Sequence, residues 1–444
     1  MTIETALQNG TGWQRRFFTI WMGQALSLLG SNLVQFALVW WLTATTGSAT
    51  VLATATLAAT LPQVLLSPMV GALVDRWNRR LVMMIADSMV ALCTLVLAAL
   101  FATETVQIWH IYALLMLRSL GGTFHAPAMQ ASTTLMVPEK HYARVAGINQ
   151  ALHGSMNILG PALGALLLRV LPMFGILLID VITALMAVLP LFFFNVPQPQ
   201  RHTDSNGVAI KRSFWADFRE GLRYVQAWRG LLIMIGMAML LNFLLTPASA
   251  LSPLLVAQHF QAGAEGLAAM NAALGVGIIL GGLLLGVWGG FRRKMHTILL
   301  GISGVGVGIL LVGVAPSDGL GMAVAGMFIV GGMIALANAP IHALMQATVE
   351  PAMQGRVFGL MGSLSSGITP LSLLIAGPVA DWIGVQAWFI VAGAACLLAA
   401  LYGSSNQALM GIERGSKAST PTSDAVALPE SAPIVQSVQS AESP

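Results

Sequence analysis

The chain has 444 residues, of which 56% are apolar and only 9% are charged, whereas soluble globular proteins carry roughly 25% charged residues. This composition excludes a soluble protein, because so few charges cannot cover the surface of a chain of this length, and the apolar surface must face lipid. Two cysteines, Cys93 and Cys396, lie in apolar stretches and form neither a disulfide framework nor a CxxC metal site. We expect no metal, no cofactor and no nucleic-acid partner.

Long apolar stretches, separated by short polar or Gly/Pro-containing segments, follow one another along most of the chain. A helix needs about 20 residues to cross the hydrocarbon core of a bilayer. The stretches lack the alternation of polar and apolar residues that is typical of barrel strands, so an all-α membrane protein is predicted. Twelve spans are predicted, at 17–43, 49–73, 81–101, 108–127, 144–169, 172–194, 230–257, 266–289, 296–315, 320–341, 356–380 and 386–403.

One long charged segment divides the twelve spans into two groups of six. Its second part, Ser213 to Trp228, has apolar residues at helical spacing with charges between them, which predicts an amphipathic helix on the membrane surface. The end of the chain is rich in Ser, Ala and Pro and predicts disorder. The expected organisation is a disordered N-terminus at 1–12, an N-terminal half at 13–194, a linker at 195–229, a C-terminal half at 230–405 and a disordered tail at 406–444.

Positive charges are distributed very unevenly between alternate connections. All but two of the 21 Lys and Arg residues fall on one side of the predicted spans, the exceptions being Arg118 within the fourth span and Arg169 at the far end of the fifth. The opposite connections carry acids such as Glu104 and Glu265. Because positively charged loops stay in the cytoplasm, both termini are predicted to be cytoplasmic.

The two halves retain traces of an internal repeat. The segment from Gly71 to Arg80, after the second span, is answered by the segment from Gly286 to Lys294 after the eighth. Pro127 near the end of the fourth span similarly answers Pro340 near the end of the tenth. Parallel six-helix halves related in this way place a binding site between them, near the bilayer midplane.

Arg118 is the sharpest single signal, because an unpaired arginine near mid-bilayer costs at least ~2.5 to 3.5 kcal/mol. Asp180 in the sixth span lies at a similar depth, counted at about 1.5 Å per residue, so the two could meet. Asp87 in the third span is shallower and is the second candidate acid. The pair could be a static lock of the N-terminal half. Otherwise Asp180 would bind and release a proton, which predicts proton coupling if this region opens to water alternately on each side of the membrane.

Several polar side chains within spans could face a central cavity, and helix packing is an equally good interpretation for each of them. His153 and Asn157, one turn apart in the fifth span, are interpreted as packing residues. The candidates for the cavity are Gln24, Asn32 and Gln35 in the first span and Asn242 in the seventh.

The segment GALVDRWNRR resembles the loop signature of the major facilitator superfamily, in which an Asp follows a Gly and precedes a basic cluster. In that family the Asp sits at the positive N-terminal end of the eleventh span, a dipole interaction worth roughly 0.3 to 2 kcal/mol, and this contact exists only while the cytoplasmic side is closed. The family usually has Gly where this chain has Asn78, although Asn tolerates left-handed backbone. The resemblance implies a gating loop of Gly71, Asp75, Arg76, Arg79 and Arg80.

The fifth span resembles a signature of the proton-coupled exporters of this superfamily. Gly147, Gly160, Pro161 and Gly164 match it. Small residues and a proline allow a kinked helix to pack closely against its neighbour, which would seal the pathway in one state.

Longer segments, including RSLGGTFHAPAM and ILLIDVITA, resemble the macrolide-efflux branch of the superfamily over about residues 13 to 405. The resemblance implies the major facilitator fold, a bacterial inner membrane, a monomer, and export of bulky, often cationic amphiphiles in exchange for protons. Export of an endogenous metabolite such as a siderophore, or uptake of a solute, stays open. No HExxH, nucleophile elbow or Walker A sequence occurs, so an enzyme is not expected, and a passive channel would need a polar lining in both halves.

Overall fold

The structure, a computed structural model, describes residues 12–74, 77–194, 214–349 and 351–414. All regular secondary structure among the described residues is helical, which confirms the predicted all-α class. The helices are α2 (Gly12–Thr46), α3 (Ala49–Val74), α4 (Arg79–Ala102), α5 (Ile108–Met136), η1 (Glu139–His141), α6 (Tyr142–Val170), α7 (Met173–Phe193), α8 (Phe214–Ala227), α9 (Arg229–Leu254), η2 (Leu255–His259), α10 (Ala264–Trp288), α11 (Lys294–Val314), α12 (Leu320–Thr348), α13 (Pro351–Ile383), α14 (Val385–Ser405), α15 (Gln407–Met410) and η3 (Ile412–Arg414).

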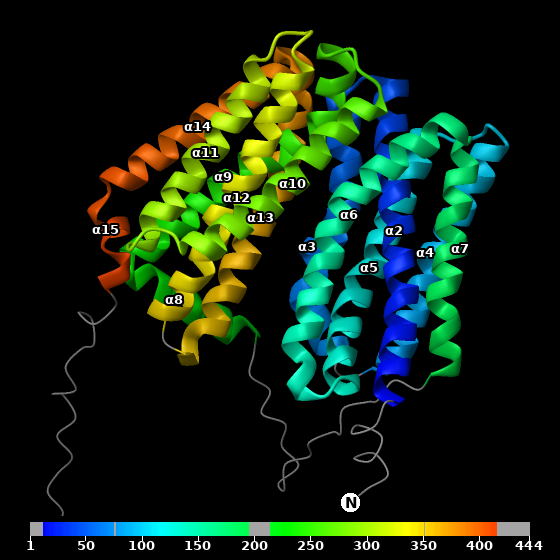
Figure 1. Ribbon diagram of the computed structural model, residues 1–444, viewed down its shortest axis with the longest axis horizontal. Helices are drawn as coiled ribbons and strands as arrows, with labels where there is room; N and C mark the ends of the chain where they lie inside the picture. Colours follow the sequence, from blue (N-terminus) through cyan, green and yellow to red (C-terminus); the bar gives the residue numbers. More distant parts are fainter. Residues whose placement is uncertain (1–11, 75–76, 195–213, 350, 415–444) are drawn as a thin grey trace, which may run out of the picture.

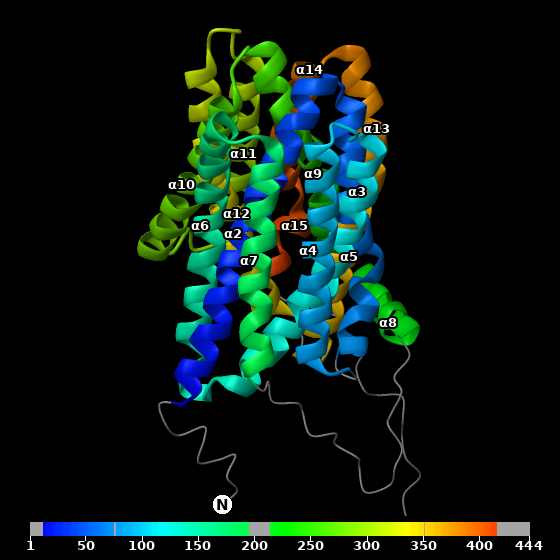
Figure 2. The ribbon, with the colours of Figure 1, turned by 90° about the vertical axis from the view of Figure 1, so that its right-hand side faces the viewer.

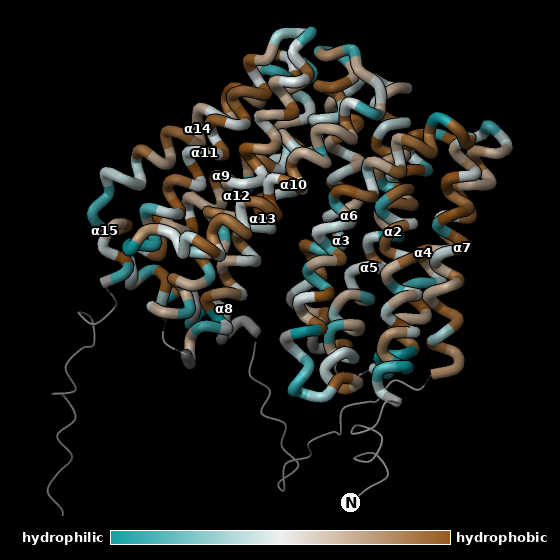
Figure 3. Tube along the Cα trace, in the orientation of Figure 1, coloured by the Kyte–Doolittle hydropathy of each residue, from teal (hydrophilic) through white to brown (hydrophobic). Residues whose placement is uncertain are grey.

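Eleven helices in the described part of the chain are long and apolar enough to cross a membrane. The remaining predicted span, the fourth, is α5, which has 29 residues but contains Arg118 and His125 within its apolar sequence. Large apolar side chains cover the outside of the bundle, among them Val287 at 91% and Trp382 at 87% exposure. A soluble monomer rarely exposes so much apolar surface. Hydrophilic residues gather mostly toward the helix ends (Figure 3). The surface therefore suits lipid.

The helices form two bundles that lie side by side (Figures 1 and 2). In the first bundle α2 and α4 pack against α7, and α3 and α4 pack against α5. In the second, α12 packs between α10 and α11, α14 packs against α11, and α13 packs against α9. The main contacts between the bundles are α3 with α13 and α6 with α10. The segments 1–11, 195–213 and 415–444 lie outside the described residues, so the structure leaves the predictions made for them open.

The second bundle is held by very close helix approaches at glycine. A Cβ atom on Gly281 of α10 would lie 2.6 Å from Cα of Gly332 in α12, so only glycine lets the two backbones meet there. Gly282, the next residue, has nothing within 4 Å of its Cβ position. Close contact through small residues replaces the hydrophobic driving force that is missing between helices in lipid.

These adjacent glycines give a matched test of the packing. Gly281→Leu should lower the free energy of unfolding by roughly 1 to 3 kcal/mol, because overpacking forces the backbones of α10 and α12 apart. Gly282→Leu should leave it nearly unchanged. Thermal unfolding of the two purified variants in the same detergent measures the difference, and equal midpoints would contradict the assigned packing.

Candidate functional site

The two bundles are linked at one end of the molecule, opposite the end where α2 begins. We call the end at which α2 begins the basic end, because described arginines at or between the helix ends, such as Arg79, Arg80 and Arg292, lie there. At the opposite end, three polar links between the bundles are found among the described residues. They are the contacts of Asp381 with the start of α3, of Gln258 Nε2 with the carbonyl of Gly47 at 2.8 Å, and of Arg169 Nη2 with Glu265 Oε1 at 3.0 Å.

The Asp381 contact joins α13 to the N-terminus of α3. One carboxylate oxygen accepts a hydrogen bond from the backbone N–H of Ala49 at 2.6 Å, and the other accepts one from Thr50 N–H at 2.9 Å and one from the Ser48 hydroxyl at 3.0 Å. The first N–H groups of a helix have no partner within the helix and carry its positive dipole end, so a carboxylate is well placed there. One turn earlier, Gly377 brings α13 to within contact of the first turns of α3.

A cavity of about 940 Å³ lies within the first bundle. Its lining comes from α2, α3, α4, α5 and α6, and runs from Ser31 and Arg118 in the middle of their helices to Tyr142 at the basic end. A volume of this size suits a drug-sized ligand, for which pockets of about 300 to 1,000 Å³ are usual.

Asp180 of α7 lies at the convergence of four helices and is completely buried, at 0% exposure. Arg118 Nη1 on α5 lies 2.6 Å from Asp180 Oδ2 and also contacts the Thr94 hydroxyl. The Thr94 hydroxyl on α4 lies 2.9 Å from the same oxygen, and the Ser31 hydroxyl on α2 donates to Oδ1 at 3.0 Å. Sequence reasoning placed Arg118 and Asp180 at similar depth, and the structure places them in contact. Sequence reasoning missed Ser31 and Thr94, whose hydroxyls complete the hydrogen bonding of the carboxylate.

Gly30 explains how α7 comes so close to α2. A Cβ atom there would meet Thr183 Oγ1 and would lie 3.1 Å from Cα of Asp180. A larger residue would therefore push α7 away and open the Ser31 contact. The neighbouring Gly30 and Ser31 thus fix the position of the buried acid.

A second polar cluster lies on the cavity wall. Asp87 of α4 is 8% exposed and accepts a hydrogen bond from Gln24 Nε2 of α2 on Oδ2, at 2.9 Å. Its other oxygen lies 3.3 Å from Nε2 of His125 on α5, but this nitrogen makes no hydrogen bond among the described residues. Sequence reasoning selected Asp87 and Gln24 and missed His125. A signal was available, because His125 lies seven residues, or two turns, after Arg118 and so occupies the same face of the helix.

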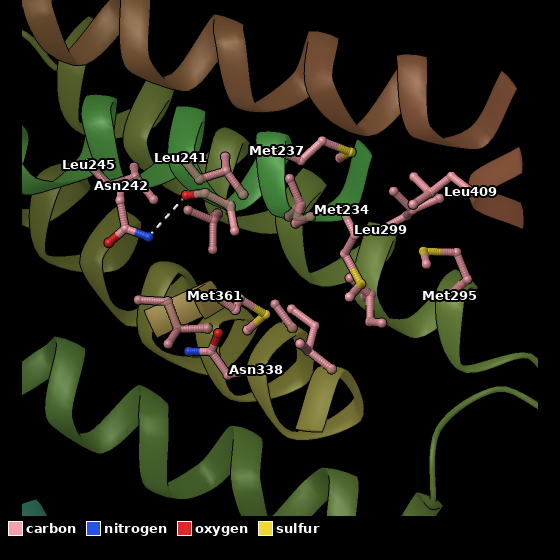
Figure 4. A pocket seen from close by; sticks show the side chains of 17 residues that line it. Met234, Met237, Leu241, Asn242, Leu245, Met295, Leu299, Asn338, Met361 and Leu409 are labelled. Carbon is pink, nitrogen blue, oxygen red and sulfur yellow. Dashed lines mark hydrogen bonds between the residues drawn. The ribbon is translucent and has the colours of Figure 1, made fainter. Parts of the chain in front are cut away.

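The predicted cavity residues are distributed over different surroundings. Gln24 and Gln35 line the large cavity. Asn32 is not among the lining residues: its amide nitrogen donates to the carbonyl of Leu28 at 2.7 Å, and its Cβ is close to Gly160 of α6. Asn242 lines a separate pocket in the second bundle (Figure 4).

The pocket of the second bundle has a volume of about 230 Å³ and is almost entirely apolar. Its walls come from α9, α11, α12, α13 and α15, and Asn242 and Asn338 are its only amide side chains (Figure 4). No ionisable side chain lines it. Four methionines lie around it: Met234, Met237, Met295 and Met361. Because methionine is flexible and polarisable, such a wall can adapt to differently shaped apolar groups.

The glycines predicted for the fifth span lie on α6. A Cβ on Gly160 would lie 3.0 Å from Cβ of Asn32, and one on Gly164 would lie 2.7 Å from the ring of Phe36, so this face of α6 packs against α2. Pro161 lies inside the helix between them. Gly147, nearer the basic end, has nothing within 4 Å of its Cβ position.

The basic loop after α3 binds the ends of helices in its own bundle. Arg79 Nη1 donates to the carbonyl of Ala131 in α5 at 2.8 Å, and Arg80 Nη2 donates to that of Phe192 at the end of α7, also at 2.8 Å. Asn78 has φ −69° and its side chain caps α4 by accepting from the N–H groups of Arg80 and Leu81. The predicted reason for Asn78, tolerance of left-handed backbone, is therefore wrong, since the residue serves as a helix cap. Gly71 lies in α3 near its end, whereas Asp75 and Arg76 lie outside the described residues.

The buried pair can be tested for its effect on stability. Arg118→Met should cost about 3 to 5 kcal/mol of stability, because it leaves the buried Asp180 carboxylate without its cation. The double variant Arg118→Met with Asp180→Leu removes both charges and should recover most of that loss. Thermal unfolding in detergent measures both variants, and a double variant no more stable than the single one would show that the ion pair is not what stabilises this region.

Comparison with known proteins shows which family has this sequence pattern. The Major Facilitator Superfamily profile matches residues 20–368. The chain is 32% identical to "Macrolide efflux protein A" of Streptococcus pyogenes over 87% of this chain and 95% of that protein, and 28% identical to "Multidrug efflux pump Tap" of Mycolicibacterium fortuitum over 83% and 90%.

Among solved structures, a bacterial homologue of the human lysosomal transporter Spinster, described as inward-facing and unoccupied, has a TM-score of 0.66 at 13% identity, covering 91% of this chain and 98% of that chain. The nucleoside transporter NupG has a TM-score of 0.58 at 14% identity, covering 87% and 98%. At this identity the structures show the fold alone. Together with the matched profile and the identity to curated relatives, they show that this chain is a multi-pass membrane transporter of small molecules and belongs to the major facilitator superfamily.

Proposed function

We propose that this transporter exports bulky amphiphilic compounds, of which macrolides are the leading candidates, from the cytoplasm in exchange for protons. The observation that carries the proposal is the coincidence of a drug-sized cavity with the intramembrane ionisable groups: Arg118, Asp87 and His125 all line the same 940 Å³ space. The efflux relatives support the choice of substrate class.

The orientation follows from the charges. Because basic loops remain cytoplasmic, the basic end would face the cytoplasm of a bacterial cell and both termini would lie there. Polar links join the two bundles at the opposite end, while the bundles diverge toward the basic end (Figure 1). This arrangement would be the inward-facing state, from which substrate is loaded. In the outward-facing state, Asp75, which follows α3 in the sequence, would meet the beginning of α13, with Arg76, Arg79 and Arg80 beside it.

Asp180 would carry the coupling proton. In this state it lies behind Arg118, whose guanidinium is the part of the pair that reaches the cavity. A proton bound to Asp180 from the external side would remove the charge that holds Arg118, and release of that proton to the cytoplasm would restore the pair. The helices α2, α4 and α5, which supply the partners of Asp180, also line the cavity, so changing the pair would shift the walls that hold the substrate.

Accumulation of a radiolabelled macrolide in efflux-deficient bacteria tests this function. Cells expressing the wild type should accumulate less compound than cells with an empty vector, and a protonophore should abolish the difference. Asp180→Asn should behave like the empty vector. A panel of cationic dyes and a siderophore, measured in parallel, distinguishes drug export from export of an endogenous metabolite. If no macrolide responds while the siderophore does, the proposed substrate class is wrong.

The link at the opposite end should set the balance between the two states. Asp381→Asn removes the charge that attracts the N-terminus of α3 and should favour the outward-facing state by about 1 to 2 kcal/mol, a roughly fivefold to thirtyfold change in the equilibrium constant. Spin labels at Ala44 and Trp382, on different bundles, should report a larger population of long distances. Asp318→Asn, an exposed acid at the same end, serves as the control. An unchanged distance distribution for Asp381→Asn would show that this link does not hold the end closed.

A further inference from the structure

The two acids near the cavity differ in the kind of cation that balances them. Asp180 is enclosed by Arg118, Ser31 and Thr94, and its balancing cation is an arginine, which keeps its charge at all physiological pH values. Asp87 faces His125 instead, and histidine is the side chain that can gain or lose its charge near neutral pH. The side chain opposite Asp87 can therefore lose its positive charge by releasing a proton, whereas the side chain opposite Asp180 keeps its charge.

The hydrogen bonding around Asp87 is also incomplete. Gln24 satisfies one carboxylate oxygen, and the other lies 3.3 Å from an imidazole nitrogen that is buried and makes no hydrogen bond among the described residues. All three side chains line the large cavity. Asp180 is not part of that lining. A substrate in the cavity can approach the Asp87 carboxylate without disturbing the Arg118–Asp180 pair.

We propose that Asp87, His125 and Gln24 form the subsite that binds the ammonium group of a cationic substrate, and that the substrate's charge replaces a proton on His125. The inference rests on the proposed export function and adds to it the residues that hold the charged group of the substrate and the source of the proton that is released.

The charges balance in a single exchange. In the empty inward-facing state, the Asp87 carboxylate is paired with a protonated imidazole. When an organic ammonium group binds to the Asp87 carboxylate, the His125 imidazolium releases a proton to the water of the cavity, and the net charge of the subsite is unchanged. After the transporter opens outward and the substrate leaves, His125 takes a proton from the external side. One cation leaves the cell for each proton that enters through this subsite, and this proton is separate from the one proposed for Asp180.

The other titratable and charged groups around the subsite do not perform this exchange. Arg118 on α5 and Tyr142 and His153 on α6 line the same cavity, and Asp180 lies behind Arg118. Among the described residues, neither Tyr142 nor His153 has a carboxylate partner: the Tyr142 hydroxyl donates to the carbonyl of Thr134. An imidazole next to a carboxylate on the cavity wall is found only at His125.

Binding measurements on the full-length protein in detergent test the subsite. The probes are a macrolide whose amino sugar is methylated to a quaternary, permanently charged ammonium group, and the uncharged N-oxide of the same macrolide. Asp87→Asn should weaken binding of the cationic probe at least tenfold and change binding of the N-oxide less than twofold. Binding of the N-oxide also shows that the variant is folded.

Proton release is followed in the same samples with an indicator dye in weak buffer. The wild type should release up to one proton per cationic probe bound, most strongly at a pH between about 5 and 8 where histidine titrates. His125→Gln should bind the cation without releasing a proton, whereas His153→Gln, the matched histidine of the same cavity, should still release it.

The outcomes separate the subsite from the export function. If Asp87→Asn weakens both probes equally, or His125→Gln still releases the proton, the subsite is wrong while drug export stands. If the wild type binds neither probe, the subsite and the macrolide assignment fail together.

Discussion

The first bundle is organised around the cost of burying a charged pair inside a membrane protein. A carboxylate without exposure, such as Asp180, must have its charge balanced and its hydrogen-bonding capacity filled. Arg118, Thr94 and Ser31 do this from three other helices, and Gly30 removes the side chain that would keep α7 at a distance. One acid on α7 therefore fixes the relative positions of four helices. Three of them, α2, α4 and α5, also form walls of the large cavity.

Closure at the end opposite the basic loops depends on a different interaction, between a carboxylate and a helix terminus. Asp381 satisfies the first N–H groups of α3, and Gly377 one turn earlier allows the contact. The proposed role of Asp75 at the other end of α3 would be its counterpart, acting on the start of α13. Each helix of this pair would thus supply an acid to the N-terminus of the other, at opposite faces of the membrane, so that the two contacts exclude one another as the bundles rock.

The sequence predicted the helices and the depth of the charges better than the details around them. Apolar length alone marked the spans, and counting residues brought Arg118 and Asp180 to the same depth. Hydroxyl partners such as Thr94 could not be found, because Ser and Thr in a helix usually bond to their own backbone, and helix rotation decides whether they reach another helix. The same rotation turns Asn32 toward Gly160 and Gln35 toward the cavity. The contact of His125 with Asp87 could not be predicted for a similar reason, since Asp87 lies on another helix and nothing near His125 in the sequence indicates the contact.

The apolar pocket of the second bundle has a consequence for how such a protein can change. His125 and Asn338 each lie two residues before one of the prolines that the internal repeat matches, so the two pockets occupy corresponding places in duplicated frames. Among the described residues, ionisable side chains line the cavity of the first bundle and none lines the pocket of the second. Substitutions among the methionines around the second pocket can reshape it without altering any charge. Under the proposed function, the range of exported compounds could thus change from one lineage to another while the proposed proton-binding residues of the first bundle stay the same.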